Sequence, residues 1–241
     1  MTKSVLALSI IALVSIPMAA RASLITGVLN VTGTVNISLG DISFEGGAFN
    51  INAPASTQQG GFMALEGTTG TIDDITNPPD ATGVALDETD FITFAAAPNI
   101  SFTLTFLFPG IDGAGECTDP IPATGQMCTP NVPDQSPFNL QNTSATASAA
   151  SFNILGTEVD TLTGDTIPVT GAFTEPFTAM TYQQLEADVF AGDTITTAFS
   201  AQFQTEALPS GTPEPSSLLE LMMGIALVGI SVVYRRKLKR T

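Results

Sequence analysis

Histidine and tryptophan are both absent from this 241-residue chain, and only seven residues are Lys or Arg. The absence of histidine excludes catalysis by Ser-His-Asp or Cys-His sets. The seven cations lie near the chain ends: Lys3, Arg21, Arg235, Arg236, Lys237, Lys239 and Arg240. Because residues 23–212 contain no Lys, Ser-Lys catalysis and a phosphate-binding loop are excluded there as well.

The acidic residues are distributed in the opposite way. The chain has 23 of them, and all except Glu214 and Glu220 lie in the cation-free segment. Such a segment repels nucleic acid and anionic lipid, and it offers no basic side chain to contact a phosphate. We therefore expect no nucleic-acid partner, and we expect stability to come from apolar burial and hydrogen bonds.

Cysteine is scarce too, since Cys117 and Cys128 are the only two. A structural metal site needs more ligands than these two thiols in a chain without histidine. Two nearby cysteines usually pair in an oxidising exported compartment. We predict a Cys117–Cys128 disulfide that stabilises the fold by about 3 kcal/mol.

The N-terminus has the three parts of a secretory signal. Lys3 lies in a short polar start, residues 5–16 form an apolar stretch, and Ala20-Arg21-Ala22 supplies small residues for cleavage. The apolar stretch has 12 residues, whereas a membrane span needs roughly 20. We predict a signal peptide over residues 1–22 and cleavage after Ala22.

A second apolar stretch, residues 218–234, predicts a transmembrane helix near the C-terminus. It has 17 residues, includes one carboxylate at Glu220, and is followed by five cations. About 17 apolar residues are enough for a span, and a basic cluster tends to stay in the cytoplasm. Arg235, Arg236, Lys237, Lys239 and Arg240 therefore predict a stop-transfer tail that leaves residues 23–208 outside the cell membrane.

The tail as a whole resembles a PEP-CTERM sorting signal over residues 213–241. The resemblance is carried by Pro213-Glu214-Pro215, the serines Ser216 and Ser217, the Leu- and Gly-rich span and the terminal basic cluster. It implies recognition by an exosortase, a membrane transpeptidase of Gram-negative bacteria that make exopolysaccharide. It also implies export machinery as a partner, a transient inner-membrane stage, and delivery to the cell surface or extracellular matrix.

The segment before the tail divides into a linker, residues 209–212, and a body, residues 23–208. The body also looks like the ectodomains of unknown activity that such proteins carry. That looser similarity rests on residues 67–72, 91–94, 128–130 and 136–140.

Alternating apolar and polar residues predict strands in the body. The three longest candidates are residues 31–39, 100–108 and 194–206. In the second, Ile100, Phe102, Leu104, Phe106 and Phe108 are expected to form one inward row. Shorter candidates are residues 41–44, 91–95, 151–155 and 169–173.

One helix is predicted over residues 182–190, because Thr181 and Gln184 have the spacing of a capping box. Many short strands, Gly- and Pro-rich turns and little helix favour an all-β fold. We predict an antiparallel β-sandwich of jelly-roll or immunoglobulin-like type, with an irregular segment over residues 109–137.

Three kinds of chemistry remain open for the body. A carboxylate pair could support a glycosidase, although no spacing selects two residues. Hydrogen-bonding side chains could bind extracellular polysaccharide. Asp87, Glu88 and Asp90 are candidate calcium ligands because oxygen-only loop clusters suit a hard cation, although they match no established calcium motif.

These observations together predict a non-enzymatic protein with no catalytic residues and no obligatory cofactor. We expect an exported structural component of the surface or biofilm matrix, associated with exopolysaccharide. A carbohydrate- or calcium-binding surface module is the alternative, followed by a carboxylate-dependent glycosidase.

Overall fold

β-strands dominate the parts of the chain that the computed structural model describes, which are residues 24–51, 57–76, 80–113, 117–132 and 135–205. The predicted signal peptide, linker, sorting motif, apolar span and basic tail all lie outside these residues. Within the described ranges, no helix combines the length and the hydropathy of a transmembrane span.

Twelve strands, two short 3-10 helices and one α-helix make up the described body. In chain order they are β1 Gly27–Ile37, β2 Asp41–Phe44, η1 Glu45–Gly47, β3 Ala48–Ile51, η2 Gly60–Leu65, β4 Thr69–Ile72, β5 Ile75–Thr76, β6 Ala85–Phe94, β7 Ile100–Leu107, β8 Met127–Cys128, β9 Asn139–Ser144, β10 Ala147–Asp160, β11 Thr166–Phe177, α1 Tyr182–Phe190 and β12 Ile195–Thr205.

All twelve strands belong to one antiparallel sheet, and eight of them close into a barrel. The order around the ring is β11, β12, β1, β3, β4, β6, β7 and β10, and β10 then pairs with β11. The antiparallel all-β class is thus confirmed. The predicted sandwich of two facing sheets is not what forms, because the β10–β11 pairing joins the two ends of the sheet.

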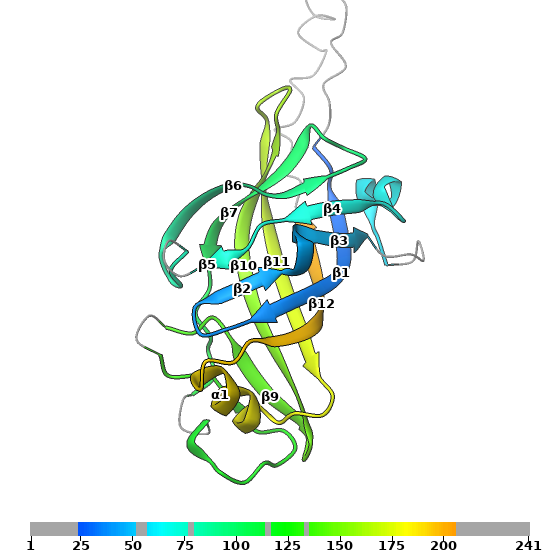
Figure 1. Ribbon diagram of the computed structural model, residues 1–241. Coiled ribbons are helices and arrows are strands. Elements are labelled where there is room, and N and C mark those ends of the chain that lie inside the picture. Colours follow the sequence, from blue (N-terminus) through cyan, green and yellow to red (C-terminus); the bar gives the residue numbers. More distant parts are fainter. Residues whose placement is uncertain (1–23, 52–56, 77–79, 114–116, 133–134, 206–241) are drawn as a thin grey trace, which may run out of the picture.

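The remaining four strands extend the sheet beside the ring. β9 continues along the edge of β10 beyond the part that β7 occupies, and β8 pairs with β9. β2 shares an edge of β1 with β3, and β5 pairs with β2. In Figure 1, α1 and β9 lie at one end of the barrel, here named the helix end, and the β10–β11 turn lies at the other, here named the turn end.

Phenylalanine rings fill the barrel interior. Phe152 and Phe173 stack with ring centroids 4.5 Å apart, and Phe203 meets Phe173 edge-on at 5.5 Å. Further almost fully buried rings that join this set through ring contacts are Phe44, Phe49, Phe62, Phe94, Phe102 and Phe199. Because such rings bury large apolar areas, this cluster is the main source of stability in a body that has no basic side chain for an ion pair.

Two strand glycines make room for these rings. A Cβ atom at Gly70 would lie 2.2 Å from the Phe49 ring and 2.4 Å from the Thr93 carbonyl oxygen. A Cβ atom at Gly171 would lie 2.7 Å from Ile154 and 2.9 Å from Phe203. Small residues opposite large ones are how narrow barrels fill their interior.

The local predictions can be compared with the structure element by element. The helix is confirmed at Tyr182–Phe190, and its capping box joins Thr181 and Gln184 as expected. The three long strand candidates form β1, β7 and β12, but Leu39 lies beyond β1 and is exposed.

The single inward row predicted for residues 100–108 is wrong beyond Leu104. The pairing of β7 with β10 shifts register between Leu155 and Gly156. The bulge turns Leu107 inward, while Phe106 is half-buried and Phe108 is exposed. A one-residue shift moves side chains to the other face of a strand.

Two buried carboxyl groups near the turn end each accept a backbone N–H at one oxygen, while the other oxygen, Glu158 Oε2 or Asp160 Oδ2, has no hydrogen-bond partner among the described residues. The Ile25 N–H donates to Glu158 Oε1 at 2.6 Å, and the Leu162 N–H donates to Asp160 Oδ1 at 2.9 Å. Burial raises the pKa of Glu158 to about 7, and the Leu162 N–H holds the pKa of Asp160 below its usual value. The Ile25 contact attaches the beginning of the described chain to β10.

A third carboxyl group, Glu175 on β11, has no such partner. Its side chain is fully buried, and neither oxygen has a hydrogen-bond partner. It pairs across the ladder with Ala150 of β10. Burial raises the pKa of Glu175 to about 8, so the folded state holds this carboxyl group protonated at neutral pH.

Replacing Glu175 is expected to reduce the pH dependence of stability. Between the usual pKa near 4.5 and the folded value near 8, the folded chain keeps a proton that the unfolded chain has lost. The free energy of unfolding therefore falls as pH rises through this window. In Glu175→Gln that fall should shrink by a few kcal/mol, leaving the smaller contributions of Glu158 and Glu186.

Urea unfolding at intervals from pH 4 to pH 9 measures the effect. Glu45→Gln is the matched control, because Glu45 is an exposed carboxyl group on the same chain. Equal slopes in wild type and Glu175→Gln would contradict a neutral buried carboxyl group.

Candidate functional site

A cavity of about 120 Å³ lies at the helix end of the barrel. Its walls come from α1, the turn between β1 and β2, residues 130, 132 and 135–138, and Leu107, Leu140 and Ala150 on three strands. Most of the lining is apolar and comprises Ile37, Leu39, Ile42, Ile75, Leu107, Pro130, Val132, Pro137, Phe138, Leu140, Ala150, Leu185, Val189 and Phe190.

Asn142 of β9 positions the helix that forms one wall. Its Oδ1 accepts from the Tyr182 N–H at 2.9 Å, and its Nδ2 donates to Gln183 Oε1 at 3.0 Å. Asn142 is fully buried. Since these bonds satisfy a buried amide and the first turn of α1 together, they hold the Leu185 and Glu186 face of the helix against the cavity.

The opposite wall belongs to the long connection between β7 and β9. The Gly110 N–H donates to the Ser136 carbonyl at 2.9 Å, and the Ile111 N–H donates to Asn139 Oδ1 at 2.8 Å. The predicted disulfide is confirmed: Cys117 and Cys128 are bonded at 2.05 Å, with Cα atoms 5.3 Å apart. These links keep an otherwise irregular segment at the mouth of the barrel.

The charged groups that line the cavity are all acidic. They are Asp41 after the β1–β2 turn, Asp80 before β6, and Glu186 on α1. Asp80 is almost fully buried and accepts from the Thr76 N–H at 3.2 Å. Because the described chain contains no Lys or Arg, nothing offsets the negative potential of this site.

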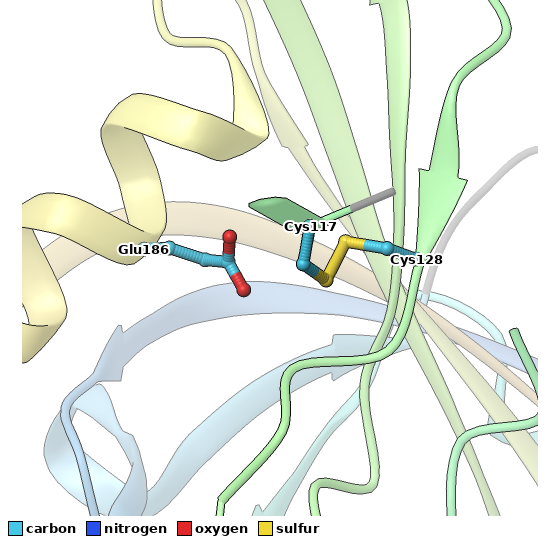
Figure 2. Close-up of side chains that lie close together, drawn as sticks. All are labelled: Cys117, Cys128 and Glu186. Carbon is cyan, nitrogen blue, oxygen red and sulfur yellow. A yellow bond between two sulfur atoms is a disulfide. The ribbon is translucent and has the colours of Figure 1, made fainter. Parts of the chain in front are cut away.

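Glu186 lies between the cavity and the disulfide. Figure 2 shows its carboxylate pointing from α1 toward the bond between Cys117 and Cys128, and its oxygen lies within 4.8 Å of both sulfurs. Glu186 is half-buried and no described residue gives it a hydrogen bond. Burial alone raises the pKa of Glu186 to about 7.

Among the described residues, Cys117, Cys128 and Glu186 are the only group of three or more His, Cys, Asp or Glu side chains close enough to hold a metal ion. The two sulfurs are joined in a disulfide, whereas metal binding requires thiolates. The oxidised group therefore does not fit a metal.

The candidate calcium ligands lie elsewhere, on β6. Asp87, Glu88 and Asp90 do not converge into a ligand set, and Asp90 has a left-handed backbone with φ 57°. Burial, followed by repulsion from Asp80, Asp73 and Asp87, raises the pKa of Glu88. Glu88 is thus influenced by Asp87 on the same strand and by Asp73 and Asp80 outside it, but the three candidate ligands do not form a preformed calcium site.

Sequence reasoning missed the residues that form this site. No spacing in the sequence distinguishes Glu186 and Asp80 from the many other acidic residues. Glu175, which pairs with the lining residue Ala150, lies in no recognisable motif either. One signal was present: Glu175 occupies an inward position in an alternating strand, between Phe173 and Phe177. Its polar side chain at an apolar position could have marked it as buried.

Searches with this chain found no matching family model, no similar curated protein and no similar solved structure.

Removal of the Glu186 charge is expected to speed reduction of the disulfide above pH 7. An ionised carboxylate beside the sulfurs repels an incoming thiolate, and it destabilises the thiolate that leaves. In Glu186→Gln the reduction rate at pH 8, corrected for thiolate concentration, should rise several-fold. At pH 6, where Glu186 is mostly protonated, the two rates should converge.

The rates can be followed by alkylation and intact mass after addition of dithiothreitol. Asp188→Asn removes the same charge from the same helix and is the matched control. Identical pH profiles for Glu186→Gln and wild type would show that this carboxylate does not act on the disulfide.

Proposed function

We propose that this chain is an exported protein that an exosortase sorts to the cell surface or extracellular matrix of a Gram-negative bacterium. Its folded body is a structural, non-enzymatic component of that exopolysaccharide-associated layer, without a saturable glycan-binding site of its own. The tail resemblance at Pro213-Glu214-Pro215 supports the sorting route, and the acidic, cation-free body supports an extracellular role.

The observation that carries the proposal is the disulfide in the folded body. Cys128 is completely buried, and its partner Cys117 crosslinks the loop at the mouth of the barrel. Disulfides of this kind persist in oxidising, exported compartments. A disulfide-bonded body agrees with a signal peptide that directs it out of the cytoplasm.

The architecture suits a component that must stay folded and dispersed outside the cell. Ring closure pairs both edges of the long strands β10 and β11, and unpaired edges are where sheets aggregate. Acidic side chains without neighbouring cations repel other copies of the body. These features support a hydrated matrix module.

Proteolytic removal of the tail is the first expected outcome. The mature surface form should end near residues 213–215 and lack residues 218–241, because two prolines, which resist helix continuation, directly precede the apolar stretch in the sequence, where a membrane enzyme could bind them. Intact-mass measurement of surface and medium fractions from the native host tests this. A surface form that retains residues 218–241, both in the native host and in a host without the sorting enzyme, would instead make the tail an ordinary anchor.

If the body has a structural role, the surface form isolated from the host should bind neither glycans nor calcium at a specific site. A polysaccharide array should show no saturable binding, and a calcium titration should give no site that depends on Asp87, Glu88 and Asp90. The triple variant D87N/E88Q/D90N is the comparison for calcium. Saturable glycan binding, or calcium affinity lost in the triple variant, would replace the structural role with a binding module.

A further inference from the structure

The cavity at the helix end has the size and surface of a small binding site. Its volume of about 120 Å³ is close to that of apolar cavities of roughly 150 Å³ that hold one benzene ring. Two large apolar side chains at the opening, Leu39 and Phe190, are 58% and 53% exposed. A molecule seated in the cavity would cover apolar surface that water now contacts, which favours binding.

The charged groups around the cavity determine whether a cationic or an anionic apolar molecule is favoured. Its ionisable lining groups are Asp41, Asp80 and Glu186, and the protonated Glu175 lies next to the lining residue Ala150 on the adjacent strand. An anionic molecule would meet only negative potential here, since no described residue is Lys or Arg. A cationic molecule would be attracted by the same groups.

Glu186 is the group placed to contact such a cation. It lines the cavity, and burial disfavours its charged form because no described residue donates a hydrogen bond to it. The neighbouring disulfide cannot donate a hydrogen bond to it. An ammonium group beside Glu186 would supply both the missing donor and the missing positive charge. Asp80, by contrast, already accepts from the Thr76 N–H.

We propose that this cavity binds a small organic cation, in which a ring-sized apolar group fills the cavity and a protonated amine pairs with Glu186. The inference uses only the lining residues of the cavity and none of residues 213–241, so it does not depend on how the chain is delivered. The proposed ligand, a small organic cation, differs from both the glycan and the calcium ion considered above.

Three probes of nearly equal shape test the charge preference: benzylammonium, benzyl alcohol and benzoate. Binding is measured by calorimetry on the full-length chain held in phosphatidylcholine nanodiscs, with empty nanodiscs as the blank for partitioning. At pH 8 benzylammonium should bind saturably, about tenfold tighter than benzyl alcohol because of the charge-assisted hydrogen bond. Benzoate should bind at least as weakly as the alcohol.

The matched variants assign the preference to Glu186. Glu186→Gln should lose the advantage of benzylammonium over benzyl alcohol and keep the affinity for the alcohol, which also reports that the cavity is intact. Asp188→Asn, on the same helix but outside the cavity lining, should behave like wild type. Phe190→Ala should weaken both probes at least twofold, whereas Leu162→Ala at the exposed turn end should not.

The pH dependence of benzylammonium binding distinguishes an ion pair with Glu186 from general attraction by the acidic surface. The affinity for benzylammonium should rise from pH 6 to pH 8 as Glu186 ionises, and this rise should be absent in Glu186→Gln. Any of three results would overturn the proposal: no saturable binding, equal affinities for the three probes, or a preference for benzylammonium that Glu186→Gln leaves unchanged.

Discussion

The ladder between β10 and β11 is the interaction on which the rest of the fold depends. It runs from Ser148 opposite Phe177 to Val159 opposite Thr166, and it joins the two ends of the sheet. β7 and β9 share the other edge of β10, while β12 occupies the other edge of β11. Without this ladder the sheet would open, and the phenylalanine interior would lose one of its walls.

A second constraint follows from the lack of cations in the body. A buried carboxyl group is usually paired with a basic side chain, but the buried carboxyl groups described here accept hydrogen bonds from backbone N–H groups or neutral side chains, such as Asn99 at Asp160, or they are protonated. Asp160 takes the first course and Glu175 takes the second, while Glu158 has both a backbone donor and a raised pKa. Protonation of side chains, in place of ion pairing, therefore links the stability of this barrel to pH.

The helix end combines several local features into one site. Asn142 holds the first turn of α1, the disulfide holds the loop opposite, and Glu186 lies between that disulfide and the cavity. Most of these groups are far apart in the sequence, and each has an ordinary local explanation. Because they converge, the Glu186 carboxyl group lies between an apolar cavity and the two disulfide sulfurs.

The sequence by itself determined the local features of this body. The alternation in β1, β7 and β12, the capping box at Thr181, and the pairing of the only two cysteines all depend on neighbouring residues or on composition. Only the tertiary structure decided that the sheet closes into a barrel, that a bulge turns Phe106 and Phe108 away from the core, and that Glu186 meets the disulfide. The physical reason is that pairing between strands far apart in the sequence, such as β1 and β12, depends on how side chains pack in the whole interior. A local sequence pattern does not determine that packing.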